Sequence, residues 1–309
     1  MPSIKIRLGG KCNQNCKFCH SNKGDEYKFN PKLIPFIKYN DFTSITYSGG
    51  EPLLYWDIIK YMIDLLPDKS NCIVSNGSLF NEEMLDYCIK YNISFAVSLN
   101  EYTNIDDTTW ELIGKIPNLY TAKVYTGNKT LNELDKLVEM FNNKTHRNIK
   151  TYWYNLMHST CNNDLVYTKE AKDHYINEMK SRLRNALYSL VIHKPTKWSC
   201  LLGYLCKFLL SNKIQGCSTY QHMTVSLDGR IMDCSYIAEY GTSIEDIYNY
   251  SYPKLYKDSC YSCQLNTKCH SCNKTKNDDQ CEIYNELYSY VKEVCTEYNL
   301  DIDNLSKYF

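Results

Sequence analysis

The sequence predicts an α/β protein in which strands and helices alternate over the first two thirds of the chain and a smaller, cysteine-rich domain with a β-hairpin follows. Two observations support this prediction. One is the alternation itself, and the other is the uneven placement of the 16 cysteines, of which three precede residue 20 and ten follow residue 199. The composition shifts after Pro195, so we place the first domain at residues 1–195 and the second at residues 196–309.

The predicted strands are short apolar or alternating runs, and the predicted helices carry apolar residues at helical intervals. Strands are expected at residues 4–8, 42–47, 71–74, 94–99, 120–125 and 148–156, and helices at 53–66, 81–91, 108–113 and 131–142, with a longer helix at 168–191 that leaves the sheet. Strands separated by helices of this length form parallel βαβ units with right-handed crossovers. Ligands in such sheets bind at the carboxyl ends of the strands.

Charge and hydropathy exclude several classes of protein. The 35 basic and 35 acidic side chains balance, so the chain lacks the excess of basic residues that binding to nucleic acid usually requires. The N-terminus lacks the apolar region of a signal peptide, and Lys207 interrupts the most apolar stretch, residues 200–210, so neither secretion nor a membrane span is predicted. We expect a cytoplasmic protein, and because the cytosol keeps thiols reduced, its cysteines indicate metal binding rather than disulfides.

The first cysteine cluster follows the first predicted strand directly. Cys12, Cys16 and Cys19 form a C-x3-C-x2-C run. Three thiolates on one tight loop can hold three corners of a cubane iron–sulfur cluster and leave the fourth iron open for a substrate. The alternative is a zinc site completed by His20, although zinc ligands are usually spaced in two separated pairs.

A second motif, Gly49-Gly50-Glu51-Pro52, ends the second predicted strand. Glycines let the backbone approach a ligand closely, and the carboxylate of Glu51 can accept a hydrogen bond from an ammonium group. The alternative is an ordinary turn between a strand and a helix.

Together these two motifs resemble the signature of radical S-adenosylmethionine (SAM) enzymes, with Phe18 as the aromatic residue of C-x3-C-x-aromatic-C and with the GGEP segment 30 residues after Cys19. The resemblance implies an open, TIM-like (β/α)6 barrel, a [4Fe–4S] cluster on the three cysteines, and a GGEP segment that binds the amino group of SAM. The SAM-site residues that it implies are Phe18, Gly49, Gly50, Glu51, Pro52, Ser75, Asn76, Ser98 and Asn100. For Asn100, where the family often has Asp, a turn-forming role is the alternative.

Seven cysteines of the second half form a pattern around a predicted hairpin. Alternating runs at residues 223–227 and 230–233 flank Asp228-Gly229, a strong hairpin turn signal. Such a hairpin brings the first two of these cysteines toward the same end. The seven are Cys217, Cys234, Cys260, Cys263, Cys269, Cys272 and Cys281.

This pattern resembles the SPASM domain that follows many radical SAM barrels, except that two residues instead of three precede Cys272. The resemblance implies two auxiliary [4Fe–4S] clusters. One takes Cys217, Cys234 and Cys272, with Cys206, Cys200 or substrate as a further ligand, and the other takes Cys260, Cys263, Cys269 and Cys281. A zinc-ribbon-like module is the alternative, because residues 260–272 hold two cysteine pairs, although the five residues between the pairs are few for a ribbon.

The resemblance covers nearly the whole chain and implies an oxidoreductase that cleaves SAM reductively to a 5′-deoxyadenosyl radical and modifies a peptide or protein. We predict oxidative cross-linking, through a thioether or carbon–carbon bond, of a ribosomally made peptide, because auxiliary clusters can take up the second electron. The alternatives are peptide epimerisation and formylglycine formation by a sulfatase maturase, which Ser235 disfavours where maturases carry Asp. Two further alternatives are not enzymes: an iron–sulfur electron carrier and a zinc-binding module. Neither of them needs the GGEP segment, so this segment favours the enzyme.

The expected partners are the peptide or protein substrate and an electron donor such as flavodoxin or ferredoxin. The cysteine motif begins at residue 12, so a leader peptide is expected to bind a separate protein or the barrel itself. The sequence assigns no catalytic acid or base.

Overall fold

A computed structural model describes residues 3–19, 21, 24–149, 154–156, 167–206, 210, 222–234, 237–245 and 278–308. The predictions for His20, Cys217, Ser235, Cys260, Cys263, Cys269 and Cys272 lie outside the described residues.

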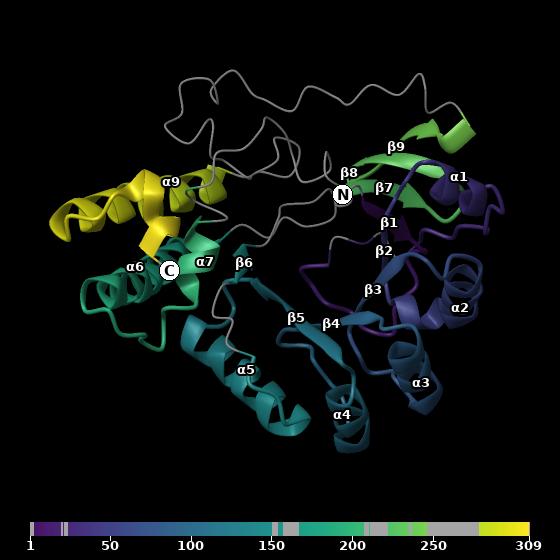
Figure 1. The fold of residues 1–309 in the computed structure, drawn as a ribbon, viewed down its shortest axis with the longest axis horizontal. Helices are drawn as coiled ribbons and strands as arrows, with labels where there is room; N and C mark the ends of the chain where they lie inside the picture. Colours follow the sequence, from purple (N-terminus) through teal and green to yellow (C-terminus); the bar gives the residue numbers. More distant parts are fainter. Residues whose placement is uncertain are drawn as a thin grey trace.

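The described part is built on one nine-stranded sheet with the strand order β6-β5-β4-β3-β2-β1-β7-β8-β9. Neighbouring strands from β6 to β1 pair in parallel, as the predicted βαβ units require. The bounds are β1 (Ser3–Arg7), β2 (Ser44–Ser48), β3 (Ser70–Ser75), β4 (Ser94–Leu99), β5 (Asn118–Tyr125) and β6 (Asn155–Leu156). In Figure 1 these strands fan across the molecule.

The crossover helices lie along one side of this fan, outside the arc of strands (Figure 1). They are α1 (Leu33–Tyr39), α2 (Trp56–Leu65), α3 (Glu82–Lys90), α4 (Asp107–Gly114) and α5 (Leu131–Thr145), and the 3-10 turn η1 (Pro52–Tyr55) precedes α2. Side chains cap the N-termini of three of them: Asn81 for α3, Asp106 for α4, and Thr130 for α5, the last in a capping box with Glu133. Local sequence therefore fixes where these helices begin.

The two faces of the sheet differ in chemistry. In β1, Ile4 and Ile6 are fully buried in the apolar core shared with the helices. Lys5 and Arg7 point to the opposite face, where they line a cavity. Because side chains alternate along a strand, this separation follows directly from the sequence Ser-Ile-Lys-Ile-Arg.

A hairpin extends the sheet beyond β1. β7 (His222–Ser226) pairs in parallel with β1, and β8 (Arg230–Cys234) pairs antiparallel with β7 and with β9 (Ile237–Ser243). Gly229 has a φ of 88° in the connecting turn, a conformation that glycine adopts without strain. The predicted hairpin at Asp228-Gly229 is thus confirmed. It continues the barrel sheet, and the domain boundary after Pro195 stays a prediction.

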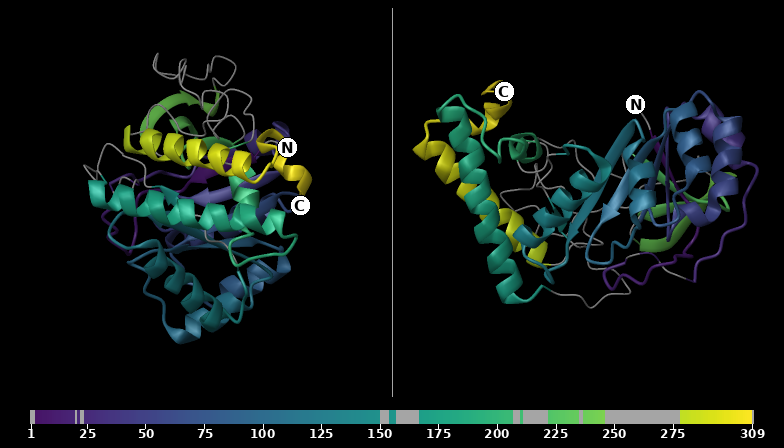
Figure 2. Two further views of the ribbon diagram at one scale, coloured as in Figure 1. Left: turned by 90° about the vertical axis from the view of Figure 1, so that its left-hand side faces the viewer. Right: turned by 90° about the horizontal axis from the view of Figure 1, so that it is seen from below.

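At the other end of the fan, α6 (Lys169–Val191) and α9 (Asp278–Glu297) run side by side (Figures 1 and 2). They share a second apolar core with the short helix α7 (Leu201–Leu205) and with η5 (Ile302–Tyr308), through residues such as Met179, Leu183 and Val291. Three ion pairs join the facing surfaces of α6 and α9: Lys172 with Glu282, Lys180 with Glu286, and Arg184 with Glu297.

The α/β class, the parallel sheet of a partial barrel and the long helix at 168–191 are confirmed. No helix in the described ranges is both long enough and apolar enough to cross a membrane.

One buried charge lies where the barrel meets α6. Lys123 on β5 is 5% exposed, and its Nζ lies 5.3 Å from the centroid of the Tyr154 ring. Burial lowers the pKa of Lys123 to about 8, although the negative charges of Asp135 and Cys200 act in the opposite direction. Asp135 itself pairs with Arg182 at 3.1 Å and accepts a 2.7 Å hydrogen bond from the Tyr154 hydroxyl. Folded Lys123 therefore loses its proton more readily than Lys123 in the unfolded chain, and it is mostly neutral only above about pH 8.

This lowered pKa makes stability depend on pH. Between pH 8 and 10.5 the unfolded chain binds the proton that folded Lys123 releases, so the cost of the buried charge is largest below pH 8 and fades above it. We expect Lys123→Met to gain free energy of unfolding at pH 7 by about 3 kcal/mol relative to wild type, and by about 2 kcal/mol at pH 9. Urea unfolding at the two pH values measures this. Lys136→Met on the exposed side of α5 is the control, and a Lys123→Met gain that does not shrink with pH contradicts the assignment.

Candidate active site

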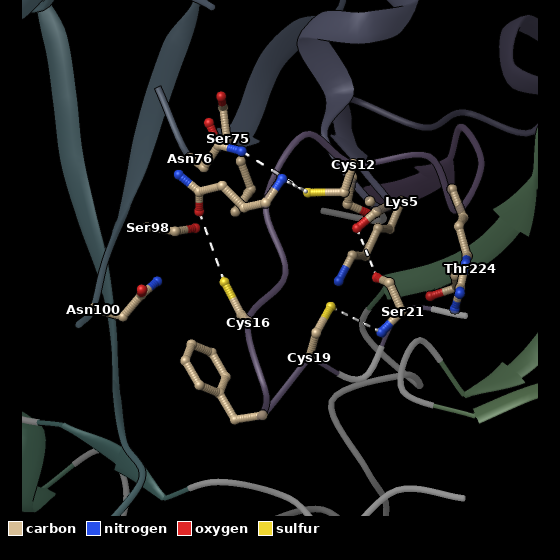
Figure 3. A pocket seen from close by; sticks show the side chains of 17 residues that line it. Lys5, Cys12, Cys16, Cys19, Ser21, Ser75, Asn76, Ser98, Asn100 and Thr224 are labelled. Carbon is tan, nitrogen blue, oxygen red and sulfur yellow. Dashed lines mark hydrogen bonds between the residues drawn. The ribbon is translucent and has the colours of Figure 1, made fainter. Parts of the chain in front are cut away.

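A cavity of about 180 Å³ opens at the carboxyl ends of β1 to β4, where the sequence predicts the ligand site. Figure 3 shows the three cysteines, Ser75, Asn76 and Ser98 around one space. The full lining is Lys5, Arg7, Cys12, Gln14, Cys16, Phe18, Cys19, Ser21, Ser48, Gly49, Gly50, Val74, Ser75, Asn76, Ser98, Asn100 and Thr224. The structure thus brings together all three predicted cluster cysteines and seven of the nine predicted SAM-site residues. The other two, Glu51 and Pro52, are buried and do not line the cavity.

Cys12, Cys16 and Cys19 lie on the loop that follows β1, which we call the cysteine loop. Local hydrogen bonds hold this loop. The backbone N–H of Gln14 donates to the Cys12 sulfur at 3.4 Å, and that of Ser21 donates to the Cys19 sulfur at 3.4 Å. The N–H of Cys19 donates to the carbonyl of Cys16 at 3.1 Å, which closes a turn. Backbone N–H groups that point at sulfur stabilise a thiolate, the form that binds iron.

The same loop is joined to the end of β2 by backbone hydrogen bonds. Gly50 N donates to Gly9 O and Glu51 N donates to Lys11 O, both at 2.8 Å. A Cβ on Gly50 would lie 2.1 Å from Lys11 O, and one on Gly49, where φ is 144°, would lie 2.5 Å from Gly9 O. The two glycines are therefore required by the close approach of the cysteine loop itself. From the sequence, these glycines are expected to let the backbone approach a ligand. In the structure they let the end of β2 approach the cysteine loop.

Glu51 is buried and is not part of the lining. Its Oε1 accepts hydrogen bonds from Ser75 Oγ at 2.6 Å and Leu53 N at 3.0 Å, and its Oε2 accepts one from Asn76 N at 2.8 Å. Burial raises the pKa of Glu51, while these three donors favour its ionised form. The carboxylate ties the end of β2 to the end of β3, and its contact with a SAM ammonium stays a prediction.

The ends of β3 and β4 supply polar groups to the cavity. Asn76 Nδ2 donates to Asn13 Oδ1 at 2.8 Å and lies 4.0 Å from the Cys12 sulfur. Asn100 Oδ1 accepts from Tyr102 N at 2.8 Å, so the turn-forming role of Asn100 is present. Asn100 also lines the cavity. Phe18 packs against Tyr102 with ring centroids 5.9 Å apart.

Seven lining residues were not predicted from the sequence: Lys5, Arg7, Gln14, Ser21, Ser48, Val74 and Thr224. Strand alternation is the signal that could have found Lys5 and Arg7, because the intervening isoleucines are apolar. Thr224 could not have been found in this way, since it reaches the site only through the pairing of β7 with β1. Ser21 lies just beyond the motif and donates to Gly49 O at 2.7 Å.

Residues 6–151 match the sequence model of the Radical SAM superfamily. The barrel of this chain belongs to that superfamily. Among curated proteins, the chain is similar to an uncharacterized protein of Methanocaldococcus jannaschii, at 27% identity over 32% of this chain and 39% of the relative. It is also similar to the radical SAM cyclopropyl synthase TigE of Paramaledivibacter caminithermalis, at 29% identity over 33% of this chain and 29% of the relative. The alignments therefore span well under half the length of these relatives.

The fold is similar to solved structures over nearly its whole length. Native anSMEcpe with bound AdoMet has a TM-score of 0.70 at 16% identity, covering 97% of this chain and 99% of the other. The form with bound AdoMet and the Cp18Cys peptide has a TM-score of 0.69 at 16% identity, covering 96% and 98%. At this identity the likeness establishes the fold, and it includes the part of the chain after the radical SAM barrel.

The donor set of the cavity fits the cluster and SAM that the superfamily uses. Three cysteine side chains share one lining, and thiolates are the ligands of [4Fe–4S] clusters. Among the described residues, no three His, Cys, Asp or Glu side chains gather closely enough to hold a single metal ion. In a cubane each thiolate binds a different iron, so its ligands need not converge on one point as those of zinc do.

Of the predicted auxiliary-cluster cysteines, Cys206, Cys234 and Cys281 fall within the described residues. Cys234 ends β8, and Cys281 lies near the start of α9. The two upstream candidates, Cys200 and Cys206, flank α7, and burial raises the pKa of Cys206. The choice between these two as a cluster ligand stays a prediction, as do the auxiliary clusters.

The contacts of Glu51 predict what its substitution does. Glu51→Gln places an amide N–H₂ where one carboxylate oxygen accepts hydrogen bonds, so at least one buried donor loses its acceptor. We expect the free energy of unfolding to fall by about 1–3 kcal/mol and SAM affinity to fall with it, because Asn76 shifts. Urea unfolding and equilibrium dialysis of SAM measure the two effects. Glu26→Gln, on the exposed side of the cysteine loop, is the control. Weaker SAM binding at unchanged stability would show instead that Glu51 contacts SAM and that the loop does not depend on it.

Proposed function

We propose that this protein is a radical SAM oxidoreductase that closes a thioether or carbon–carbon cross-link in a ribosomally made peptide. The observation that supports it most is the shared lining of one cavity by Cys12, Cys16 and Cys19, Gly49 and Gly50, and the polar ends of β3 and β4. When bound there, the cluster and SAM supply a one-electron cleavage of SAM to methionine and a 5′-deoxyadenosyl radical.

The chain's own residues bind and orient in this scheme. The three cysteines hold three irons of the cluster. The polar groups of Ser75, Asn76, Ser98 and Asn100 lie where they can position SAM against it. Phe18 lines the cavity and packs against Tyr102, so it adds apolar surface that helps to exclude water from a reactive radical.

The net reaction on the peptide removes two hydrogens. One leaves as a hydrogen atom and ends in 5′-deoxyadenosine. The other leaves as a proton and an electron while the new bond closes, and an auxiliary iron–sulfur cluster on the cysteines of the second half accepts that electron. The product therefore gains no atom and is lighter by two hydrogens.

Two likenesses support a peptide substrate and bond formation. The structure of anSMEcpe, whose fold this chain shares, contains a bound peptide. TigE is named a cyclopropyl synthase, which is a ring-closing reaction. Formylglycine formation is the second candidate, with Cys or Ser of a protein as the oxidised residue. The fold likeness to anSMEcpe over nearly the whole chain is the reason to keep it as an alternative.

The mass of the product separates these reactions. We expect a cysteine-containing or aromatic peptide encoded beside this gene to lose two hydrogens after reaction with enzyme, SAM and reductant. Mass spectrometry in normal and heavy water is the measurement. Unchanged mass with deuterium gained from solvent would identify an epimerase and end the cross-linking proposal. Oxidation of a sulfatase Ser or Cys to an aldehyde would establish the second candidate.

Cluster variants separate SAM cleavage from product formation. Cys16→Ala removes a ligand at the cavity, so we expect 5′-deoxyadenosine formation to fall at least a hundredfold. Cys281→Ala, on α9, is expected to stop product formation while reductive SAM cleavage continues within about threefold. Cys88→Ala, buried on α3 away from the cavity, is the control. Chromatography of 5′-deoxyadenosine and of peptide gives both rates. If Cys281→Ala loses both activities and its fold, the cysteine is a structural ligand.

A further inference from the structure

A ring of hydrogen bonds ties the cysteine loop to the end of β3 beside the cavity. Asn13, which directly follows Cys12, donates from Nδ2 to Ser78 Oγ at 2.8 Å. Ser78 Oγ donates to Asn76 Oδ1 at 2.7 Å, and Asn76 Nδ2 donates back to Asn13 Oδ1 at 2.8 Å. Three side chains therefore close a ring in which each one both donates and accepts.

The ring and its backbone contacts fix the orientation of the Asn76 amide. The backbone N–H of Ser78 donates to Asn76 Oδ1 at 3.0 Å. A backbone N–H is a donor and cannot accept, so the atom that faces it must be the oxygen of the amide. The residue itself is 8% exposed, and its own N–H donates to Glu51 Oε2 at 2.8 Å. Asn76 is thus held through both its backbone and its side chain.

This orientation turns the nitrogen of the Asn76 amide toward the Cys12 sulfur, at a distance of 4.0 Å. Both residues line the cavity (Figure 3). The same sulfur accepts from the backbone N–H of Gln14 at 3.4 Å. Hydrogen bonds to the sulfurs of an iron–sulfur cluster help to set its reduction potential, because a donor stabilises the more negative, reduced state.

From these contacts we propose that Asn13 and Ser78 are positioning residues. They orient the amide of Asn76 so that an N–H points at the Cys12 sulfur, and they thereby raise the reduction potential of the cluster that the three cysteines hold. Neither residue lines the cavity, so both act through Asn76. The proposal rests on the cluster of the superfamily and not on the reaction with a peptide. A peptide product of unchanged mass would end the cross-linking proposal and leave this one as it stands.

The midpoint potential of the SAM-binding cluster tests the proposal. Anaerobic, iron-loaded protein is titrated against potential with mediator dyes, and electron paramagnetic resonance follows the signal that SAM alters, which assigns it to this cluster. Iron content and circular dichroism confirm that each variant is loaded and folded. No turnover enters the measurement.

Two neutral variants open the ring, and two others serve as controls. Asn13→Ala and Ser78→Ala each remove one member, whereas Ser78→Thr keeps a hydroxyl. Asn118→Ala is the matched control, because it removes a 2.8 Å hydrogen bond between the side chains of two asparagines, Asn118 and Asn92, at the opposite end of the sheet.

We expect Asn13→Ala and Ser78→Ala each to make reduction of the cluster about threefold less favourable, which lowers the midpoint potential by about 28 mV. Ser78→Thr and Asn118→Ala are expected to match wild type. Asn76→Leu removes the N–H itself, so it should lower the midpoint at least as far. Adding Asn13→Ala to Asn76→Leu should then change nothing further, because residues that act through one group are not additive.

Unchanged midpoints in Asn13→Ala and Ser78→Ala would overturn the proposal, even if both variants lose stability in urea, since the ring would then be only structural. A raised midpoint would overturn it too, because water admitted to the sulfur would outweigh the lost donor. An equal shift from Asn13→Ala with and without Asn76→Leu would show that Asn13 acts without Asn76. If Asn76→Leu does not hold iron, the Asn13→Ala, Ser78→Ala double variant decides. A shift no larger than that of the stronger single variant supports the ring, and the sum of the two shifts contradicts it.

Discussion

The site depends on the close packing of two backbone segments, the cysteine loop after β1 and the turn after β2. Gly50 and Glu51 donate to the carbonyls of Gly9 and Lys11, and no Cβ fits at Gly50. The carboxylate of Glu51 then extends the connection to β3 by accepting from Ser75 and Asn76. Three strand ends are thereby locked to each other before any ligand binds, which is the preorganisation that a radical enzyme needs for positioning.

The sheet explains why the cations of β1 face the same space as the cysteines. β1 is an interior strand of the nine-stranded sheet, with β2 on one side and β7 on the other. Its isoleucines fill the core under the helices, so its polar residues have only the cavity to enter. The same strand therefore leads into the cysteine loop at its end and contributes Lys5 and Arg7 to the lining of the cavity.

Much of this architecture is predictable from local sequence, because strand alternation, helix caps and the Asp228-Gly229 turn act over a few residues. Most of the residues predicted for the N-terminal cluster and the SAM site also line one cavity, since the carboxyl ends of parallel strands meet at one edge. Side-chain direction was not predictable in the same way. Glu51 turns into the protein toward Ser75 instead of into the cavity, and the partner of Arg7, Asp25, lies 18 residues away in a loop without a pattern. The contribution of Thr224 depends on a strand pairing across more than 200 residues, which no local signal encodes.

The central claim is that Cys12, Cys16 and Cys19 hold a [4Fe–4S] cluster with an open iron that binds SAM. Electron paramagnetic resonance of the reduced protein, recorded with and without SAM, tests it most directly. The account predicts that SAM changes the spectrum of the wild-type protein and has no effect on that of Cys12→Ala, in which this cluster loses one of its three ligands. A wild-type spectrum that SAM does not alter, or the same SAM-induced change in Cys12→Ala, would contradict the account.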